Sequence, residues 1–394
     1  MTLTPEVDAH PLWVENLRRH ATLGELRRSP FFAEWGGRIE RFLSTPQVVP
    51  LPGAAPRLGS FLRVASWNVE KGRRFEEVAR LLEADPVLRW ADVILLNEAD
   101  RGMNRSGNRH VARDLARRLG MHMVFAPAHF ELTKGVGEDL DLQGENREGL
   151  QGNAILSRYP IEEARTVMLP VSFEPYEFHE KRFGRRNCVW ARLRLGKGAL
   201  WAGTTHLELR NTPACRAAAI RCILERLPGA GDEAYLLGGD LNTNTFGRGT
   251  AWRTLKAASR LLLLPPSRVA RQLLHPESGR EPLFAALRRG GFEWEGLNAP
   301  GETARAPIGS LEEMRVLPRP LRSLLPGRLD AYGGYLGLKL DWLLGKHVRG
   351  LRAGQARDRA AGVESADPGC RAAVHTGPDR LSDHLPVYAD LDLA

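Results

Sequence analysis

From about residue 60 onward, apolar runs of strand length alternate with amphipathic stretches of helix length, and this alternation limits the chain to a few fold classes. The segments "FLRVASW" and "DVILLN" are short, apolar and bounded by polar residues, as buried strands are. Between them, "RFEEVARLLEAD" places its apolar side chains on one helical face: Phe75, Val78, Leu81 and Leu82. The alternation indicates an α/β fold in which helices cover a sheet.

Further elements continue this pattern toward the C-terminus. A helix over "NRHVARDLARRLG" ends at Gly120, and another begins with Thr212 as its N-cap and Pro213 at its first position. Seven later segments are predicted strands: "HMVFAP", "GNAILS", "NCVWARLRL", "ALWAGTTHL", "AYLLGGD", "KLDWLLG" and "LPVYADLDL". The strands and helices together predict one main domain over residues 61–394.

Three segments depart from the strand and helix rhythm. Residues 1–60 predict an N-terminal helical extension followed by a linker, "STPQVVPLPGAAPRLGS", which is dense in Pro, Gly and Ala. We expect the extension to pack on the main domain, although an independent module is the alternative. Long insertions are expected near 246–335 and 348–380, and we expect at least one of them to border a substrate groove, since long loops tend to be functional or mobile.

The charge balance favours anionic partners. Lys and Arg number 56 against 47 Asp and Glu, which gives a net charge of +9. Arg-rich chains also reach such a balance without binding polyanions, so both interpretations stay open. Four cysteines without a CxxC pair predict reduced thiols: Cys188, Cys215, Cys222 and Cys370.

The chain shows neither a targeting nor a membrane-spanning pattern. The first twenty residues lack the basic start and apolar run of a signal peptide. No window of about 18 apolar residues occurs. We therefore expect a soluble cytoplasmic protein without an integral membrane segment, and a monomer.

Polar residues collect where apolar strands end. Carboxylates at the ends of several buried strands are costly to desolvate, and a divalent cation is their natural balance. The residues in question are Asn68 in "VASWN", Glu98 in "VILLNE", His206 in "WAGTTH", Asp240 and Asn242 in "YLLGGDLN", Asp341 in "LKLDWLL", and Asp383 and His384 before "LPVYADL".

Each of these motifs alone also has a structural explanation. Asp240 could cap a tight turn, His206 could be an ordinary buried histidine, and Asp341 could pair with an arginine. Asp100 and Arg101 are expected to be surface loop residues. The remaining histidines are expected to be structural or exposed, among them His110, His122, His129, His179, His275, His347 and His375.

Taken together, seven segments resemble the endonuclease/exonuclease/phosphatase superfamily of metal-dependent phosphohydrolases: "SWNVEKG", "LLNEAD", "GNAILSRYPI", "TTHLE", "GGDLNT", "LDWLLG" and "SDHLPV". The resemblance covers residues 61–394 and leaves residues 1–60 outside. It implies a four-layer α/β sandwich, with two mixed β-sheets flanked by helices, and a catalytic domain over 61–394.

The resemblance also implies site residues. It assigns Mg²⁺ or Mn²⁺ to Asn68, Glu98 and Asp383, with Glu70 as a further ligand. Many members have Asp at the position of Glu70 and Gln at that of Asn97, so this sequence departs at both. It places Asp240 and Asn242 beside the attacking water, and Asp341 as the residue that holds the catalytic imidazole of His384. It makes His206 a hydrogen-bond donor to the transition state and Asn153 a substrate-binding residue. Whether Asp240 or His384 is the general base stays open at this point.

The resemblance implies phosphodiester hydrolysis by in-line attack of water on phosphorus. The expected activity is that of a nuclease; a lipid-headgroup phosphodiesterase or an inositol-phosphate-type phosphatase is the alternative, and a non-catalytic binding module is a third. His206 stands where apurinic endonucleases commonly have Tyr, and "VEKG" lacks their acidic pair, which disfavours that branch.

Two further segments bear on the substrate. Basic residues in the first insertion could follow a phosphate backbone or form a solvated helical face: Arg248, Arg253, Lys256, Arg260, Arg268, Arg271, Arg288 and Arg289. The segment "RLLLLPP" at 260–266 is the candidate for membrane contact, and we expect it to pack inside.

Overall fold

The computed structural model describes residues 12–196, 198–229, 232–247, 250–307, 333–371 and 380–392, and its strands form two large sheets. Sheet A has the order β1-β4-β5-β3-β2-β17-β16, with β7 also paired to β4. Its strands are β1 (Gln47–Val49), β2 (Leu62–Asn68), β3 (Val93–Arg101), β4 (His122–Glu131), β5 (Leu150–Ser157), β7 (Arg182–Gly184), β16 (Gly369–Cys370) and β17 (Val387–Leu391). Sheet B has the order β13-β10-β9-β8-β6. Its strands are β6 (Ile161–Met168), β8 (Asn187–Arg194), β9 (Ala199–Thr205), β10 (Ala234–Asp240) and β13 (Asp341–Lys346).

Both sheets are mixed, and they pack face to face. The β2–β3 and β9–β10 pairs are parallel, whereas β2–β17 and β10–β13 are antiparallel. The inner faces share an apolar core that includes Val64, Leu95, Val189, Leu236 and Leu343. Apolar burial between the sheets is what holds the two layers together.

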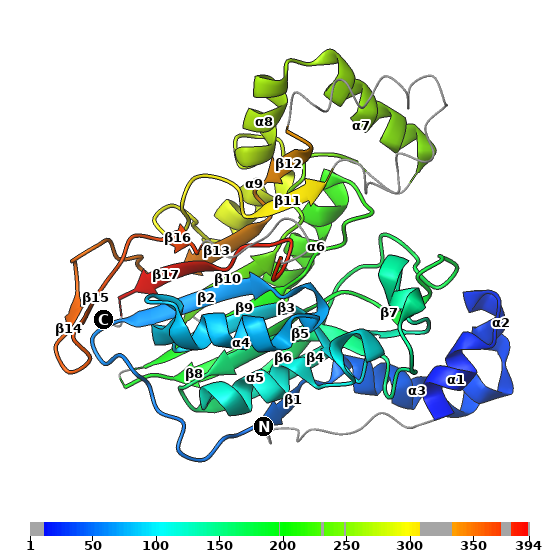
Figure 1. Cartoon of the computed structure of the whole chain (residues 1–394), viewed down its shortest axis with the longest axis horizontal. Helices are drawn as coiled ribbons and strands as arrows, with labels where there is room; N and C mark the ends of the chain where they lie inside the picture. The colour runs from blue at the N-terminus through cyan, green and yellow to red at the C-terminus, as the bar shows by residue number, and fades with distance from the viewer. Residues whose placement is uncertain are drawn as a thin grey trace.

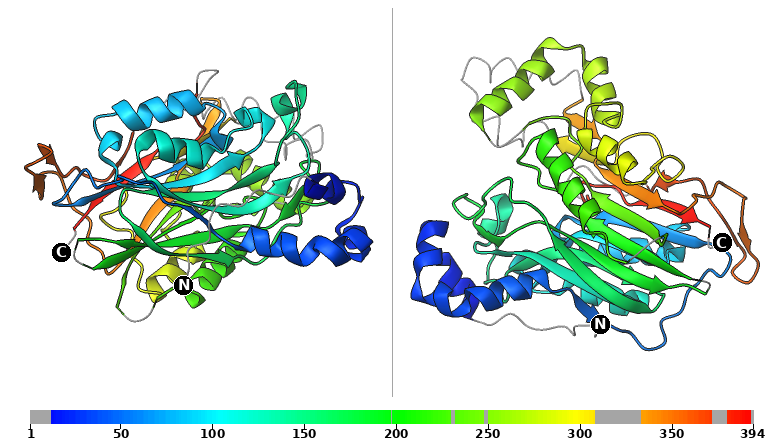
Figure 2. Two further views of the ribbon diagram at one scale, coloured as in Figure 1. Left: turned by 90° about the horizontal axis from the view of Figure 1, so that it is seen from below. Right: turned by 180° about the vertical axis from the view of Figure 1, so that it is seen from behind.

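Helices cover the outer face of each sheet. α4 (Phe75–Ala84) and α5 (Val111–Leu119) pack on sheet A, while α6 (Pro213–Glu225) and α9 (Pro282–Arg289) pack on sheet B. Figure 2 shows the two sheets between these helix pairs. The arrangement confirms the expected four-layer α/β sandwich.

The local signals for two of these helices act as predicted. Thr212 caps α6 by accepting a hydrogen bond from the Cys215 amide at 3.3 Å, and Pro213 follows. Gly120 ends α5 with a φ of +68°, a conformation that glycine adopts without strain. The strand β6, at the edge of sheet B, carries no such signal, because in "IEEARTVM" only Ile161, Ala164 and Val167 are buried and mostly polar residues stand between them.

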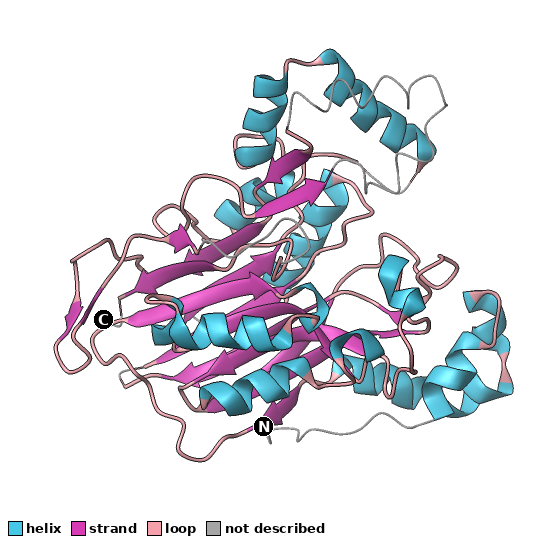
Figure 3. Ribbon diagram, in the orientation of Figure 1, coloured by secondary structure: helices cyan, strands magenta, loops and turns pink. Residues whose placement is uncertain are grey.

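The N-terminal helices lie against the edge of sheet A (Figures 1 and 3). They are α1 (Leu12–Arg18), α2 (Leu23–Arg28) and α3 (Pro30–Ser44). Trp13, Leu17 and Ile39 from these helices share a core with Phe130 of β4 and Phe183 of β7. The linker prediction is wrong for residues 47–49, because β1 pairs there with β4.

The first insertion builds a lobe that stands off the sandwich at the top of Figure 1. It holds α7 (Ala251–Leu263), α8 (Pro266–Leu274) and the antiparallel pair β11 (Ala304–Pro307) and β12 (Tyr335–Leu338). Leu261 is buried in the core of the lobe, but Leu263 is 79% exposed. The expectation that "RLLLLPP" packs inside is therefore wrong for Leu263.

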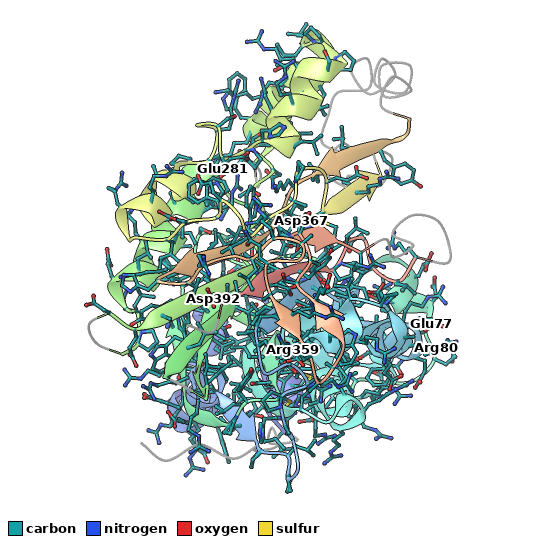
Figure 4. All side chains as sticks on the ribbon, turned by 90° about the vertical axis from the view of Figure 1, so that its left-hand side faces the viewer. Glu77, Arg80, Glu281, Arg359, Asp367 and Asp392 are labelled. Carbon is teal, nitrogen blue, oxygen red and sulfur yellow. The ribbon has the colours of Figure 1, made fainter. Side chains whose placement is uncertain are left out.

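The second insertion carries a short ribbon of β14 (Arg357–Asp358) and β15 (Val363–Glu364), with Arg359 labelled in Figure 4. The Asp358 carboxylate accepts hydrogen bonds from the amides of Gly59 at 2.6 Å and Ser60 at 3.1 Å, which ties the ribbon to the segment before β2. Short 3-10 turns complete the described elements: η1 (Glu70–Gly72), η2 (Leu88–Trp90), η3 (Asn104–Ser106) and η4 (Gly137–Asp141).

Two expectations from composition can be compared with the structure. All four cysteines are free. Among the described helices, none combines the length and the apolar character that a bilayer crossing requires.

Candidate active site

The ends of β2, β9, β10 and β13 and the bulge in β3 bring the predicted residues to one edge of the sandwich. Asp240 and Asp341 are cross-strand partners, since the last residue of β10 lies opposite the first of β13. Asn68 ends β2, which pairs with β3 beside Glu98. His384 precedes β17, which pairs with β2. Strand order thus joins residues that lie up to about 300 positions apart in sequence.

Three of these residues form what we call the relay cluster: Asp240, Asp341 and His384. His384 Nδ1 lies 2.8 Å from Asp341 Oδ2, and its Nε2 lies 3.6 Å from Asp240 Oδ2. All three side chains are buried. Burial alone would lower the pKa of His384, but Asp341 and Asp240 outweigh it and raise that pKa well above its ordinary value. The imidazole is therefore oriented and held as an imidazolium.

Thr303 fixes Asp341 from the first insertion. Its hydroxyl donates to Asp341 Oδ2 at 2.8 Å, and the Asp341 amide donates back to the same hydroxyl oxygen at 3.0 Å. The next residue, Ala304, forms a backbone bridge with His384. A segment without a recognisable motif thus supports the His384–Asp341 pair, and no signal in the sequence pointed to it.

Asp240 is poised to exchange a proton near neutral pH. Its Oδ1 accepts from the Asn242 amide at 2.9 Å, while its Oδ2 faces Asn68 Nδ2 at 3.3 Å and His206 Nε2 at 3.3 Å. Burial raises the pKa of Asp240 to about 7; the charge on His384 opposes this shift and Asp341 adds to it. A carboxylate with this pKa can act as a general base.

His206 is held in one tautomer by Arg186, a residue that the sequence analysis did not single out. Arg186 Nη1 lies 2.9 Å from His206 Nδ1, so Nδ1 accepts and Nε2 carries the proton toward Asp240. Burial and the charge of Arg186 lower the pKa of His206 well below its ordinary value. His206 is therefore a neutral hydrogen-bond donor.

The other predicted ligands form what we call the oxygen-donor cluster: Asn68, Glu70, Glu98 and Asp383. Asn68 Nδ2 donates to Glu98 Oε1 at 3.4 Å, and Asn68 Oδ1 accepts from the Glu70 amide at 3.1 Å. Glu70 Oε2 in turn accepts from the Asp383 amide at 3.1 Å. The four residues are thus connected in one chain of contacts.

A bulge in β3 aims Glu98 out of the sheet. The register with β5 shifts between Leu96 and Ala99, and Glu98 takes a φ of +54°. Burial would raise its pKa, but His206, Lys71 and Arg186 outweigh burial and lower the pKa to about 2. Because His206 is neutral at pH 7, the cations that act on Glu98 there are Lys71, Arg186 and His384. Its side chain is 21% exposed and ionised.

The donor chemistry of this cluster fits a hard divalent cation, because Mg²⁺ and Mn²⁺ prefer carboxylate and amide oxygens. Glu70 is committed through both oxygens, since Arg380 Nε donates to its Oε2 at 3.2 Å and Arg380 Nη2 donates to its Oε1. Asn68, Glu98 and Asp383 are then the three residues that could hold the ion. The ligand atoms of the relay cluster also lie within 4.8 Å of one another, but His384 and Asp341 bind each other there.

Asn153 and Asn242 use their amides inside the protein. Asn153 Oδ1 accepts from Asn97 Nδ2 at 2.8 Å, and its Nδ2 donates to Asn187 Oδ1 at 3.0 Å. Asn97 Oδ1 accepts from the Asp240 amide at 2.8 Å. Asn242 Nδ2 donates to the Leu207 carbonyl at 2.8 Å. The buried Asn153 therefore stands behind Asp240 and supports its position.

A buried ion pair anchors the loop that follows Asn242. Arg216 of α6 and Glu281, which is labelled in Figure 4, face each other with Nε and Oε2 at 3.1 Å. Glu281 Oε1 also accepts from the Thr245 amide at 2.8 Å. The loop after β10 is thus fixed to the helices outside sheet B.

The expectation that Asp100 and Arg101 lie on the surface is wrong. Both are buried, because β3 continues past the bulge instead of ending at Glu98. Asp100 binds Arg105 through two hydrogen bonds of 2.8 and 2.9 Å, and Arg101 Nε donates to Glu148 at 2.9 Å.

The other histidines and basic residues divide between structural and exposed positions. His110 caps α5 and His129 faces Glu131 at 3.2 Å, whereas His275 is exposed. Arg260 donates to the Thr245 carbonyl at 3.1 Å and Arg288 pairs with Glu295, so both are used within the fold. Arg248 and His375 lie outside the described residues.

Comparisons with known proteins give a family and several similar structures. The model of the Endonuclease/Exonuclease/phosphatase family matches residues 65–384, whereas no curated protein matches the sequence. A structure titled endonuclease/exonuclease/phosphatase from Beutenbergia cavernae DSM 12333 is 18% identical, with a TM-score of 0.49, 85% of this chain covered and 72% of that one. An endonuclease/exonuclease/phosphatase family protein from Leptotrichia buccalis C-1013-b is 12% identical, with a TM-score of 0.47. The match covers 84% of this chain and 100% of that one. The TDP2 of D. rerio, complexed with a single strand DNA product, is 14% identical, with a TM-score of 0.44. The match covers 84% of this chain and 99% of that one.

Proposed function

Because the chain belongs to the endonuclease/exonuclease/phosphatase family, whose members are generally hydrolases of phosphodiester bonds, we propose that it is a divalent-metal-dependent phosphodiester hydrolase, and specifically a nuclease. The observation that carries the proposal is the relay cluster, in which Asp240 with a pKa of about 7 faces His384 held by Asp341. A base and an acid side by side are what hydrolysis requires.

The pKa shifts of Asp240 and His384 support the proton-transfer roles that we propose. Asp240 takes the proton from water aligned for in-line attack on phosphorus, because its carboxylate is half ionised near pH 7. His384 is already protonated at that pH, so it donates instead of accepting. Asp341 keeps the imidazolium oriented through Nδ1, as the acid does in other His–Asp pairs.

One further residue stabilises charge on the phosphoryl oxygens, and another holds Asp240 in place. His206 directs its Nε2 proton toward the space beside Asp240, and Arg186 holds its orientation. Asn242 keeps Asp240 in place through its backbone amide. When bound at Asn68, Glu98 and Asp383, Mg²⁺ or Mn²⁺ supplies positive charge for the phosphate and the leaving oxygen.

One observation favours a second candidate, a lipid-headgroup phosphodiesterase. Trp252 and Leu263, near the two ends of α7, are 74% and 79% exposed. Apolar side chains of this size on a projecting lobe could enter a lipid surface.

A substrate panel with the purified protein and Mg²⁺ tests both candidates. It compares bis(p-nitrophenyl) phosphate, p-nitrophenyl phosphate, single- and double-stranded DNA, RNA and sphingomyelin. We expect cleavage of the diester, and nucleic-acid cleavage that falls steeply with salt because phosphate contacts release counterions. Cleavage of the monoester without the diester would contradict the proposed class, and preference for sphingomyelin would select the second candidate.

A further inference from the structure

An aromatic cluster on the loop between β6 and β7 is joined by one arginine from the segment between β9 and α6. We call it the platform: Phe173, Phe178, His179 and Arg210. The two phenylalanine rings meet edge to face with their centroids 5.4 Å apart. The Arg210 guanidinium lies over both rings, 4.3 Å from the Phe178 centroid and 5.7 Å from the Phe173 centroid. The phenylalanines are half-buried and His179 is exposed, so the cluster is open to solvent.

The platform is joined to the proposed active site through three contacts. The Arg210 amide donates to Glu208 Oε1 at 3.0 Å, and Glu208 Oε2 pairs with Arg186 Nε at 3.3 Å. Arg186 then binds His206. Phe173, Arg186 and Glu208 also line the same narrow cavity. Phe173 of the platform therefore lines a cavity that also exposes Arg186, the residue that holds His206.

A larger cavity continues from the narrow one toward the N-terminal helices. It encloses about 520 Å³ and shares Val171, Gly184 and Arg185 with its neighbour. Its walls include Arg27 of α2 and Arg41 of α3. In the described ranges, the guanidiniums of Arg27, Arg41 and Arg185 have no hydrogen-bonded or ionic partner. Glu40 and Glu174 also line the cavity, so three positive groups face two negative ones.

We propose that the platform and this arginine-lined cavity form one binding track for single-stranded nucleic acid. Bases stack on aromatic rings and on guanidiniums, and phosphates bind arginine. A duplex keeps its bases inside, so only an unpaired strand can place a base on the platform. The inference rests on the proposed nuclease function and deepens it by naming the form of the substrate. It also gives a role to α2 and α3, which lie outside the residues that the family model matches.

Binding of a fluorescein-labelled twelve-nucleotide oligo(dT) by fluorescence anisotropy tests the track directly. The measurement uses the full chain in an Asp240→Asn background, so that hydrolysis does not interfere. We expect Phe173→Ala/Phe178→Ala and Arg27→Glu/Arg41→Glu each to weaken binding by about tenfold, as loss of stacked bases or phosphate contacts does. Arg117→Glu/Arg221→Glu is the matched control, since it reverses two exposed arginines that line neither cavity. It should change binding less than about twofold.

Two further measurements keep the result interpretable. Phe173→Leu/Phe178→Leu retains apolar volume and should also weaken binding, which separates stacking from a folding defect. Against the Asp240-containing protein, the track variants should leave bis(p-nitrophenyl) phosphate turnover within about twofold, because this small diester reaches neither subsite. Unchanged oligo(dT) affinity in both double variants, or tighter binding to a 12-bp duplex or to phosphatidylserine vesicles than to oligo(dT), would overturn the track.

The two proposals fail separately. If the wild type hydrolyses bis(p-nitrophenyl) phosphate but does not bind oligo(dT), the track is wrong and the proposed hydrolase stands. If the track variants lose oligo(dT) binding as expected but the wild type hydrolyses no phosphodiester, the hydrolase is wrong and the track stands.

Discussion

The relay cluster and the oxygen-donor cluster lie side by side, yet they are built in opposite ways. Asp240, Asp341 and His384 are at most 8% exposed in their side chains, and they contact one another directly. Glu98 is 21% and Glu70 is 15% exposed, and Arg380 pairs with Glu70 from the surface. The buried relay cluster is preorganised by its own hydrogen bonds. In the oxygen-donor cluster, Glu98 and Glu70 keep exposed surface, so a cation can reach their oxygens from solvent. We expect the two clusters to respond differently to substitution, to pH and to metal.

The largest effect is expected in the relay cluster. His384→Ala removes the protonated donor beside Asp240 and should lower kcat by about 10²–10³, as loss of one preorganised transition-state contact does. The concentration of Mg²⁺ that gives half-maximal rate should stay unchanged, because His384 lies outside the oxygen-donor cluster. His275→Ala, at an exposed histidine, is the control. Full activity in His384→Ala would remove the proposed mechanism.

Asp341→Asn should change the pH profile. Rate should rise with pH as Asp240 loses its proton near pH 7, and fall again where His384 deprotonates. Burial lowers the pKa of His384 and Asp341 opposes this, so Asp341→Asn should lower that pKa and move the alkaline limb of kcat to lower pH. An NMR titration of the His384 ring gives the same pKa directly. If the alkaline limb does not move in Asp341→Asn, deprotonation of His384 is not its cause.

The same pKa shift predicts a change in stability. The raised pKa of His384 stabilises the folded state fully below the unfolded value of about 6.5, and this contribution is lost as pH rises through the folded pKa. Urea unfolding as a function of pH should therefore show a loss of stability on the alkaline side, and Asp341→Asn should reduce it.

Arg380→Ala tests the oxygen-donor cluster. Removal of the guanidinium frees Glu70 as a fourth oxygen ligand, so the Mg²⁺ concentration for half-maximal rate should fall a few-fold while kcat changes little. Arg371→Ala is the matched control. Arg371 Nε lies 2.8 Å from Asp85 Oδ2, and this ion pair does not involve the oxygen-donor cluster. A weaker metal response in Arg380→Ala would mean that the arginine orders Glu70 as a ligand.

Asn153→Ala is expected to act on stability more than on turnover. It leaves the buried amides of Asn97 and Asn187 short of a partner, which should cost about 1–3 kcal/mol of stability in urea unfolding. Because Asn153 supports Asp240 only through Asn97, kcat should fall by less than about tenfold. A large rise in KM with unchanged stability would instead place Asn153 against the substrate.

The sandwich was largely predictable, because most of its strands are long apolar runs. β2, β3 and β10 could be read from such runs, and so could the polar residues that interrupt them: Asn68, Glu98 and Asp240. The edge strands β1 and β6 were not predicted, since β6 is mostly polar at its exposed positions and β1 lies in a Pro-rich segment. An edge strand can do with few apolar residues, so its sequence can carry a weak signal; β13, at the other edge of sheet B, is apolar and was predicted.

The site divides in the same way. Residues at strand ends stand out because a polar group interrupts an apolar run, as Asp240 does in "LLGGDLN". Thr303 and Arg186 come from segments with no such contrast, and only the fold brings them to Asp341 and His206. Asp100 was misplaced because the bulge at Glu98 could not be foreseen, and the strand continues beyond it.

The central claim is that a metal ion bound at the oxygen-donor cluster acts together with proton transfer in the relay cluster. The most direct test measures hydrolysis of bis(p-nitrophenyl) phosphate after chelation and then during a metal titration. Turnover should fall to background in excess chelator and return with Mg²⁺ or Mn²⁺, and Glu98→Gln should need more metal for the same rate. Undiminished turnover after exhaustive chelation would contradict the account.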